Sequence, residues 1–189
     1  MVRRVILVSG PPGAGKSTVC RELVSHPASW GGTPGRVAYV EGDTFWAHLP
    51  GGTGTLDAPL PPPTRFRAVM TAMAAAALSY ALFDVDVVLD FSVPPWFLDK
   101  VRDMAAKRGV PLAFVVLLPP KAACAARVSA RAKGAVADYD AHFGSLYADF
   151  ASPDPLVPQH VVPLDSAISA SDVAAALAER LARGEFVVS

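Results

Sequence analysis

The chain has 189 residues, of which 52% are hydrophobic and 18% are charged, and its seventeen basic residues balance its seventeen acidic ones. This apolar content excludes a disordered chain and is enough for a substantial core, so we expect residues 1–189 to form a single domain. Because the chain has no net charge, its bulk electrostatics do not favour a polyanionic partner, and nucleic acid is not an expected ligand.

The amino-terminal apolar run, residues 5–8, is too short for the core of a signal peptide and predicts a buried strand. No uninterrupted apolar segment reaches the ~20 residues of a membrane span, since the nearest one, residues 70–82, contains threonine, serine and tyrosine. The two cysteines, Cys20 and Cys124, fall in predicted helices without metal-ligand spacing, which indicates packed, reduced thiols. We therefore expect a soluble cytoplasmic protein without a membrane partner. No heptad repeat predicts its oligomeric state.

Short apolar runs alternate along the chain with longer segments of helical pattern. The predicted strands are residues 5–8, 37–40, 85–89, 114–118 and 161–164. The predicted helices begin near Lys16, Thr64, Pro95, Pro120 and Ser171, and Ser171 and Asp172 are the N-cap candidates of the last one. This alternation predicts an α/β fold, in which a doubly wound sheet of five parallel strands forms the middle of three layers.

The helix predicted near residue 64 carries apolar residues three and four positions apart, which predicts one buried face. These residues are Phe66, Val69, Met70, Met73, Ala77 and Tyr80. Two connections, residues 27–35 and 50–63, are rich in glycine and proline. Long irregular connections in a compact domain are usually functional, so the second is a candidate wall or gate of a substrate site, and a tolerated surface insertion is the alternative.

The segment SGPPGAGKST directly follows the first predicted strand and precedes a predicted helix. Its Gly-x-x-x-x-Gly-Lys-Ser spacing is that of a phosphate-binding P-loop, in which glycines let backbone N–H groups approach a phosphate at the mouth of a helix. The lysine of such a loop reaches the outer phosphates and the serine hydroxyl binds Mg²⁺, so Lys16 is a predicted catalytic residue and Ser17 a predicted metal ligand. The predicted nucleotide-binding residues are Gly10, Pro11, Pro12, Gly13, Ala14, Gly15, Lys16, Ser17 and Thr18.

Acidic residues follow the second and third predicted strands, at the edge where open parallel sheets bind ligands. After the second strand, Asp43 is the candidate base that deprotonates an acceptor hydroxyl, Glu41 is the alternative carboxylate, and a helix or turn cap is the alternative role for Asp43. After the third strand, Asp90 resembles a Walker B carboxylate that holds Mg²⁺ directly or through water. A role for Asp90 in the substrate pocket is the alternative, and the roles of the two aspartates are open to exchange.

Three further residues are candidate contacts of the acceptor. Trp46 and His48 follow Asp43 closely, and Arg65 lies at the start of the helix after the long connection. A buried aromatic ring and solvated polar side chains are the alternatives. Asp84 and Asp86 come at the start of the third strand, where we expect them to face solvent outside the site.

Two arginines follow the fourth predicted strand. Arg127 and Arg131 are four residues apart and therefore share one helix face. Phosphoryl transfer needs positive charge over the γ-phosphate, and a mobile helical lid, here approximately residues 120–150, supplies it only when closed. The two arginines are thus predicted catalytic residues, and an ordinary solvated cationic face is the alternative.

Taken in order and spacing over nearly the whole chain, the P-loop, the EGD segment, the LD segment and the arginine-bearing helix resemble those of the small P-loop kinases. The group most similar holds gluconate kinase, adenylyl-sulfate kinase, chloramphenicol phosphotransferase and the zeta-toxin kinases. This resemblance implies a P-loop NTPase fold with a helical lid, ATP and Mg²⁺ as cosubstrate and cofactor, and transfer of the γ-phosphoryl to a hydroxyl. It also implies that Asp43 is the acceptor-side carboxylate and that Arg127 and Arg131 are lid arginines.

The function expected from these features is phosphorylation of a small hydroxylated metabolite or natural product, including antibiotic-type acceptors. A nucleoside, nucleotide or polynucleotide-end kinase is the first alternative, although FSVPPW follows Asp90 in place of the Asp-Gly-Phe-Pro-Arg stretch typical of adenylate kinases. The second alternative is an ATP-binding switch or ATPase module, which would hydrolyse ATP without an acceptor.

Overall fold

The computed structural model describes residues 3–48, 63–131, 138–152, 161–165 and 168–188, apart from the side chains of residues 63–65. Five strands are parallel in the order β2-β3-β1-β4-β5, and a short sixth strand pairs antiparallel with β4. The strands are β1 (Val5–Ser9), β2 (Val37–Glu41), β3 (Asp86–Asp90), β4 (Leu112–Leu118), β5 (Val161–Pro163) and β6 (Val187–Val188). The predicted sheet of five parallel strands is therefore confirmed, with β6 added to it.

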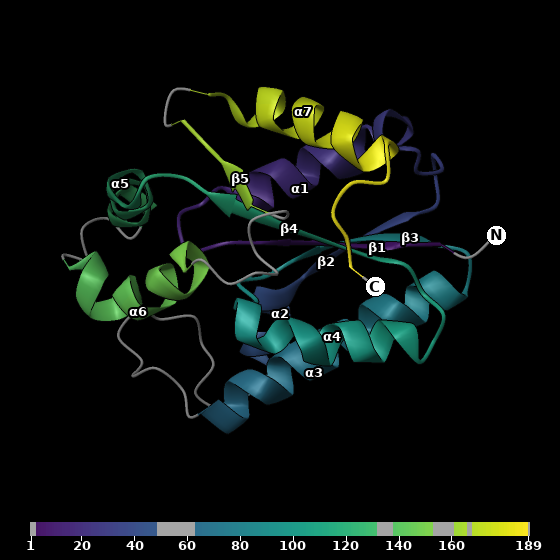
Figure 1. Cartoon of the computed structure of the whole chain (residues 1–189), viewed down its shortest axis with the longest axis horizontal. Helices are drawn as coiled ribbons and strands as arrows, with labels where there is room; N and C mark the ends of the chain where they lie inside the picture. The colour runs from purple at the N-terminus through teal and green to yellow at the C-terminus, as the bar shows by residue number, and fades with distance from the viewer. Residues whose placement is uncertain (1–2, 49–62, 132–137, 153–160, 166–167, 189) are drawn as a thin grey trace.

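Helices cover both faces of this sheet (Figure 1). They are α1 (Lys16–Ser25), α2 (Gly42–Ala47), α3 (Pro63–Leu82), α4 (Pro95–Ala106), α5 (Lys121–Arg131), α6 (Tyr139–Ala151) and α7 (Ala170–Ala182). Helices α1 and α7 lie on one face and α3 and α4 on the other, whereas α5 and α6 lie beyond the end of the sheet where β4 leads into α5 (Figure 1). None of the helices in the described ranges combines the length and apolar character that crossing a membrane requires.

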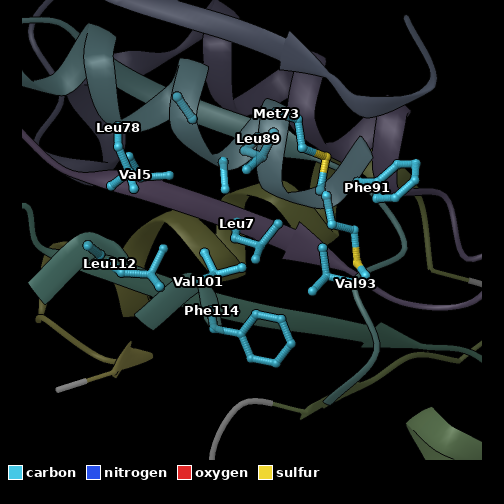
Figure 2. Packing of buried hydrophobic residues seen from close by; sticks show 14 of the residues in the cluster. Val5, Leu7, Met73, Leu78, Leu89, Phe91, Val93, Val101, Leu112 and Phe114 are labelled. Atoms are coloured by element: carbon cyan, nitrogen blue, oxygen red, sulfur yellow. The ribbon is translucent and has the colours of Figure 1, made fainter. Parts of the chain in front are cut away.

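The strands send alternate side chains into two hydrophobic cores, one on each face of the sheet. In β1, Val5 and Leu7 belong to the core that α3 and α4 cover, and Ile6 and Val8 belong to the core that α1 and α7 cover. Figure 2 shows the first core, in which strand side chains meet Met73 of α3. Burial on both faces explains why the sequences of β1, β3 and β4 are nearly continuous apolar runs.

Helix α3 buries most of its predicted face. Four residues of that face are at most 2% exposed: Val69, Met70, Met73 and Ala77. Phe66 is partly buried against the same core. The prediction that Tyr80 belongs to the buried face is wrong, because Leu78 and Ala81 occupy the core-facing positions of that turn and Tyr80 is 51% exposed.

The sequence does not predict α2, α6, β6 or a short 3₁₀ helix at Pro27–Trp30, which lies within the connection predicted to be irregular. Helix α2 begins at Gly42 directly after β2 ends at Glu41, so no loop separates the two elements. Helix α6 is missed although its sequence carries helix signals: aromatic residues recur at Tyr139, Phe143, Tyr147 and Phe150, and Asp138 caps the helix by accepting a hydrogen bond from the backbone N–H of Ala141 at 3.0 Å. The connection of residues 50–63, which is expected to form a wall or gate of the site, lies outside the described residues except for residue 63.

The N-cap of α7 is Ser169, not the predicted Ser171 or Asp172. The Ser169 hydroxyl accepts a hydrogen bond from the backbone N–H of Asp172 at 3.1 Å, and the helix begins at Ala170. The cap thus lies two residues before the earlier of the two candidates, because the serine that precedes the first helical residue takes this role.

The expectation that Asp86 faces solvent is wrong. Its side chain is only 5% exposed and accepts hydrogen bonds from the backbone N–H groups of Arg4 at 3.2 Å and Thr33 at 3.3 Å. The Arg3 guanidinium lies 3.7 Å from it. Asp84 is 41% exposed on its side chain and pairs with Arg3 at 2.7 Å. Asp86 therefore ties β1 and the segment before β2 to the start of β3.

We expect Asp86→Ala to lower the free energy of unfolding by about 2–3 kcal/mol, because two backbone N–H groups lose a buried acceptor. Chemical denaturation measures this change. Asp99→Ala is the matched control, since the Asp99 side chain is 65% exposed and its pair with Arg102 is local. The control should stay within about 0.5 kcal/mol of the wild type. Equal unfolding midpoints for the two variants would contradict the structural role of Asp86.

Candidate active site

The loop between β1 and α1 has backbone geometry that only glycine adopts easily. Gly10, Gly13 and Gly15 have φ angles of +137°, +82° and +93°. A Cβ atom on Gly10 would overlap the backbone oxygen of Leu117, and one on Gly13 would overlap that of Cys124. The glycines of the P-loop thus meet both a conformational and a packing requirement, which seats the loop against the end of β4 and against α5.

Backbone donors at the start of α1 are available to an anion. Among the described residues, the backbone N–H groups of Gly13, Gly15, Lys16 and Ser17 donate no hydrogen bond to a protein acceptor. They belong to the loop and the first turn of a ten-residue helix, where the helix dipole also favours negative charge. This donor set fits a phosphate group.

Lys16 lies among the charged residues of the predicted site. Its Nζ donates to the backbone oxygen of Pro11 at 3.2 Å. Burial lowers the pKa of Lys16, while the carboxylates of Asp90 and Asp43 raise it and the charge of Arg131 lowers it. All three predicted partners therefore lie within electrostatic range of the P-loop lysine. A desolvated ammonium of this kind is stabilised by an incoming anion.

Asp90 is a buried carboxylate at the carboxyl end of β3. It pairs in register with Val8 of β1 and Glu41 of β2, and it is 4% exposed. The Tyr39 hydroxyl donates to its Oδ2 at 3.0 Å, and among the described residues its Oδ1 accepts no hydrogen bond. A buried carboxylate oxygen without a donor fits a bound cation, and carboxylate and hydroxyl oxygens such as those of Asp90 and Ser17 are ligands that Mg²⁺ prefers.

The Tyr39 phenol is kept in its donor form. Burial raises the pKa of Tyr39, and the charge of Asp90 and the hydrogen bond to it raise the pKa further. The phenol therefore remains protonated at neutral pH and holds one carboxylate oxygen of Asp90 in a fixed direction. Sequence reasoning missed this residue, because tyrosine within an apolar strand looks like core.

The two carboxylates after β2 have different surroundings. Glu41 lies 3.8 Å from the Arg21 guanidinium, whereas Asp43, in the first turn of α2, is exposed and forms no ion pair with any described residue. Gly42 packs so closely on the Phe91 ring that a Cβ there would overlap it. This contact seats Asp43 beside the end of β3. Asp43 is thus the more exposed of the two carboxylates and the one without an ion pair among the described residues.

The two arginines of α5 face the P-loop. The Arg127 guanidinium donates to the backbone oxygen of Gly13 at 3.3 Å, and Arg131, the last residue of α5, acts electrostatically on Lys16. Because they are one turn apart, both lie on the side of α5 that approaches the loop. Arg127 thus contacts the P-loop directly, whereas Arg131 is exposed at the end of α5.

Helix α6 braces the same loop. The Tyr139 hydroxyl donates to the backbone oxygen of Pro12 at 2.9 Å, and the Tyr147 hydroxyl donates to that of Pro119 at 2.9 Å. Burial raises the pKa of both phenols, so both remain donors. Helices α5 and α6 therefore form one unit that touches the P-loop at two points. Nothing in the sequence predicts these contacts, since they join residues far apart in the chain.

The predicted acceptor residues have different environments. The half-buried Trp46 ring meets the Phe66 ring edge-on at 6.1 Å. His48 is exposed, and its ring lies 5.9 Å from that of Phe45. Arg65 belongs to α3, and its side chain lies outside the described residues. The structure thus packs Trp46 against α3 and leaves His48 exposed directly after α2.

Ser9 is a structural residue of the site that the sequence does not indicate. It is completely buried, its hydroxyl donates to the backbone oxygen of Val93 at 2.9 Å, and the hydroxyl accepts from the backbone N–H of Val93 at 2.9 Å. These two bonds fasten the segment after Asp90 to the end of β1. The carboxylate and the P-loop therefore start from strand ends that are locked together.

A phosphate-binding loop between β1 and α1 of a sheet ordered 2-3-1-4-5 defines a P-loop nucleoside triphosphate-binding protein. The chain belongs to the AAA domain family AAA_33, whose sequence pattern matches residues 5–146. No curated protein sequence matches the chain.

Solved structures of two kinases and of a tunicamycin resistance protein share this fold. A gluconokinase from Sinorhizobium meliloti 1021 is 25% identical, with a TM-score of 0.59 over 97% of this chain and 95% of the other. The APS kinase CysC of Mycobacterium tuberculosis, solved with AMPPNP and APS, is 18% identical, with a TM-score of 0.64 over 93% and 95% of the two chains. The tunicamycin resistance protein of Deinococcus radiodurans is 14% identical, with a TM-score of 0.64 over 99% of both. The predicted resemblance to the small P-loop kinases is confirmed.

Proposed function

We propose that the protein is an ATP-dependent phosphotransferase that moves the γ-phosphoryl group of ATP to a hydroxyl of a small metabolite or natural product. The observation that carries this proposal is the placement of two carboxylates at strand ends beside the P-loop: Asp90 pairs in register with Val8 of β1, and Asp43 lies in the first turn of α2, directly after the neighbouring strand β2. Asp90 is buried and has one oxygen without a donor among the described residues, whereas Asp43 is exposed and without an ion pair among them. One carboxylate suits a cation, and the other suits the acceptor.

On the nucleotide side, the free N–H groups of the P-loop and the Lys16 ammonium bind the β- and γ-phosphates of ATP. Ser17 and Asp90 would hold Mg²⁺, which supplies positive charge beside the phosphate oxygens when bound. Tyr39 keeps the Asp90 carboxylate oriented through its hydrogen bond at 3.0 Å. These residues hold the phosphates in place, and such positioning is a main contribution of a protein to phosphoryl transfer.

On the acceptor side, Asp43 orients the acceptor hydroxyl and takes its proton. The hydroxyl oxygen forms a bond to the γ-phosphorus as the bond from that phosphorus to the β,γ-bridging oxygen breaks, so ADP leaves with the bonding electron pair. Arg127 and Arg131 neutralise charge on the transferring group. The products are ADP, the phosphorylated acceptor and the proton held by Asp43.

We also propose that residues 1–189 form one domain in which α5 and α6 are the lid, at approximately residues 120–150. The contacts of Arg127 with Gly13 and of Tyr139 with Pro12 support this role, because a lid that touches the P-loop can respond to the nucleotide. Closure of this unit would move both arginines toward the phosphates and exclude water from the site.

The experiment that tests this function is ATP consumption by the purified protein with Mg²⁺ against a panel of sugars, nucleosides and hydroxylated antibiotics. Stimulation by one class of acceptor is the expected result, because a kinase turns over quickly only when its acceptor is present. Slow hydrolysis that no acceptor changes would contradict the proposal and would favour a nucleotide-dependent switch. Stimulation by nucleosides alone would reassign the acceptor class.

We expect Tyr39→Phe to raise the Mg²⁺ concentration needed for half-maximal activity by about tenfold, because residues that orient a metal ligand typically contribute that much. The variant loses one hydroxyl and keeps the ring, so the fold should be unchanged. Tyr80→Phe is the matched control, since that tyrosine is 51% exposed on α3. A Mg²⁺ titration at fixed ATP measures both variants, and identical curves would argue against Asp90 as the metal-side carboxylate.

A further inference from the structure

Four aromatic rings from four separate segments meet on the acceptor side of the site. Phe66 of α3 lies at their centre, 6.1 Å from Trp46 of α2, 5.9 Å from Phe91 after β3 and 6.3 Å from Trp96 of α4. We call these four residues the aromatic cluster. Long-range packing of this kind is not visible in the sequence, because each segment contributes only one ring.

The aromatic cluster begins at the proposed reacting groups and ends at the surface. Phe91 directly follows Asp90, and its ring packs on Gly42, the neighbour of Asp43. From there the rings continue through Phe66 to Trp96, which is 51% exposed. Phe91 itself is only 7% exposed, so the accessible part of the aromatic cluster runs from the half-buried Trp46, three residues after Asp43 in α2, through the partly buried Phe66 to this indole.

The indole of Trp96 is held in place by polar neighbours. Its Nε1 donates to Asp149 of α6 at 3.1 Å, and the Arg67 guanidinium lies over the ring at 5.6 Å from its centre. The two neighbours carry opposite charges, so within the described part of the chain they give the rim of the cluster no net charge with which to select an ionic acceptor. Its distinguishing property is a fixed, partly exposed aromatic surface.

We propose that the acceptor of this enzyme carries a flat, uncharged apolar ring that packs on Trp96 while a hydroxyl of the same molecule lies at Asp43. This inference rests on the proposed function and names the class of its acceptor. Two ring-to-ring contacts, of 6.1 Å and 6.3 Å, separate Trp46 beside Asp43 from Trp96, so the acceptor is larger than a simple sugar. Trp96 is thereby a specificity-determining residue, since an acceptor without the ring would leave the indole exposed.

The test compares two neutral probes that differ in one ring, phenyl β-D-glucoside and methyl β-D-glucoside. Equilibrium binding is measured by calorimetry with Mg²⁺ and saturating ADP, which keeps the P-loop occupied. The wild type should bind the phenyl compound about tenfold more tightly. Trp96→Ala should reduce this preference to about onefold, and Trp96→Leu, which keeps an apolar side chain, should remove most of it. Tyr80→Ala is the control, because Tyr80 is also 51% exposed and lies elsewhere on α3.

Three results would overturn the inference: no preference for the phenyl compound in the wild type, a preference that survives in both Trp96 variants, or a preference that Tyr80→Ala also removes. The last result would indicate general adsorption to exposed rings. Because the readout is binding and not turnover, a failure of the proposed function shows separately, as the absence of phosphoryl transfer to any alcohol. In that case, tighter binding of the phenyl compound that depends on Trp96 would still be measured.

Discussion

Replacing Lys16 with alanine is expected to reduce phosphoryl transfer by about a thousandfold or more, because the variant loses the ammonium that neutralises the outer phosphates as charge shifts during transfer. The wild-type ammonium is desolvated, and burial lowers its pKa against the opposing effect of Asp90 and Asp43. A charge held in such surroundings acts far more strongly on a phosphate than one in open water. Initial rates at saturating ATP and acceptor measure the loss.

The control for this variant is Lys100→Ala, which removes an exposed lysine from α4. Its rate should match that of the wild type. Lys16→Arg should also be strongly impaired, because the planar guanidinium does not fit the space of a compact ammonium. Retention of more than about a tenth of the wild-type rate by Lys16→Ala would contradict the role of the P-loop in this reaction.

Asp43→Asn is expected to lower kcat by about a hundredfold to a thousandfold while the affinity for ATP stays within about twofold of the wild type. The amide keeps the size of the side chain and loses the ability to take a proton. Because Asp43 is exposed and has no ion pair among the described residues, its replacement should not destabilise the fold. Separate measurements of kcat and of nucleotide binding distinguish a catalytic loss from a binding loss.

Glu41→Gln is the informative comparison, since Glu41 was the alternative carboxylate and lies 3.8 Å from Arg21. It should keep most of the wild-type kcat. A larger loss in Glu41→Gln than in Asp43→Asn would transfer the acceptor role to Glu41. Loss of Mg²⁺ dependence in Asp43→Asn, with normal Mg²⁺ dependence in Asp90→Asn, would show instead that the two aspartates exchange roles.

The parts of the fold that the sequence predicts are those governed by local patterns. Buried parallel strands give continuous apolar runs, and the P-loop glycines have positive φ angles that glycine adopts easily. Both features are visible in a single sequence because each one depends only on the residue types within one short segment.

The parts that the sequence does not predict depend on distant contacts. In the sequence, Asp86 looks like a solvent-facing residue at the start of a strand. The fold places the backbone N–H groups of Arg4 and Thr33 beside its carboxylate. In the sequence, Tyr39 and Ser9 look like ordinary strand residues. Only the fold shows that Tyr39 forms a hydrogen bond with Asp90 and Ser9 with Val93. Pairings of this kind follow from the order of strands in the sheet, and no local spacing carries that information.

The central claim is that this protein transfers the γ-phosphoryl group of ATP to an alcohol, and the most direct test follows that group. The protein is incubated with Mg²⁺, γ-labelled ATP and the acceptor panel, and the products are separated and identified by mass spectrometry. Label is expected in a phosphate ester of one acceptor class, in equal amount to the ADP formed, and none is expected in that ester with Lys16→Ala. Label found only in inorganic phosphate, whatever acceptor is present, would contradict it.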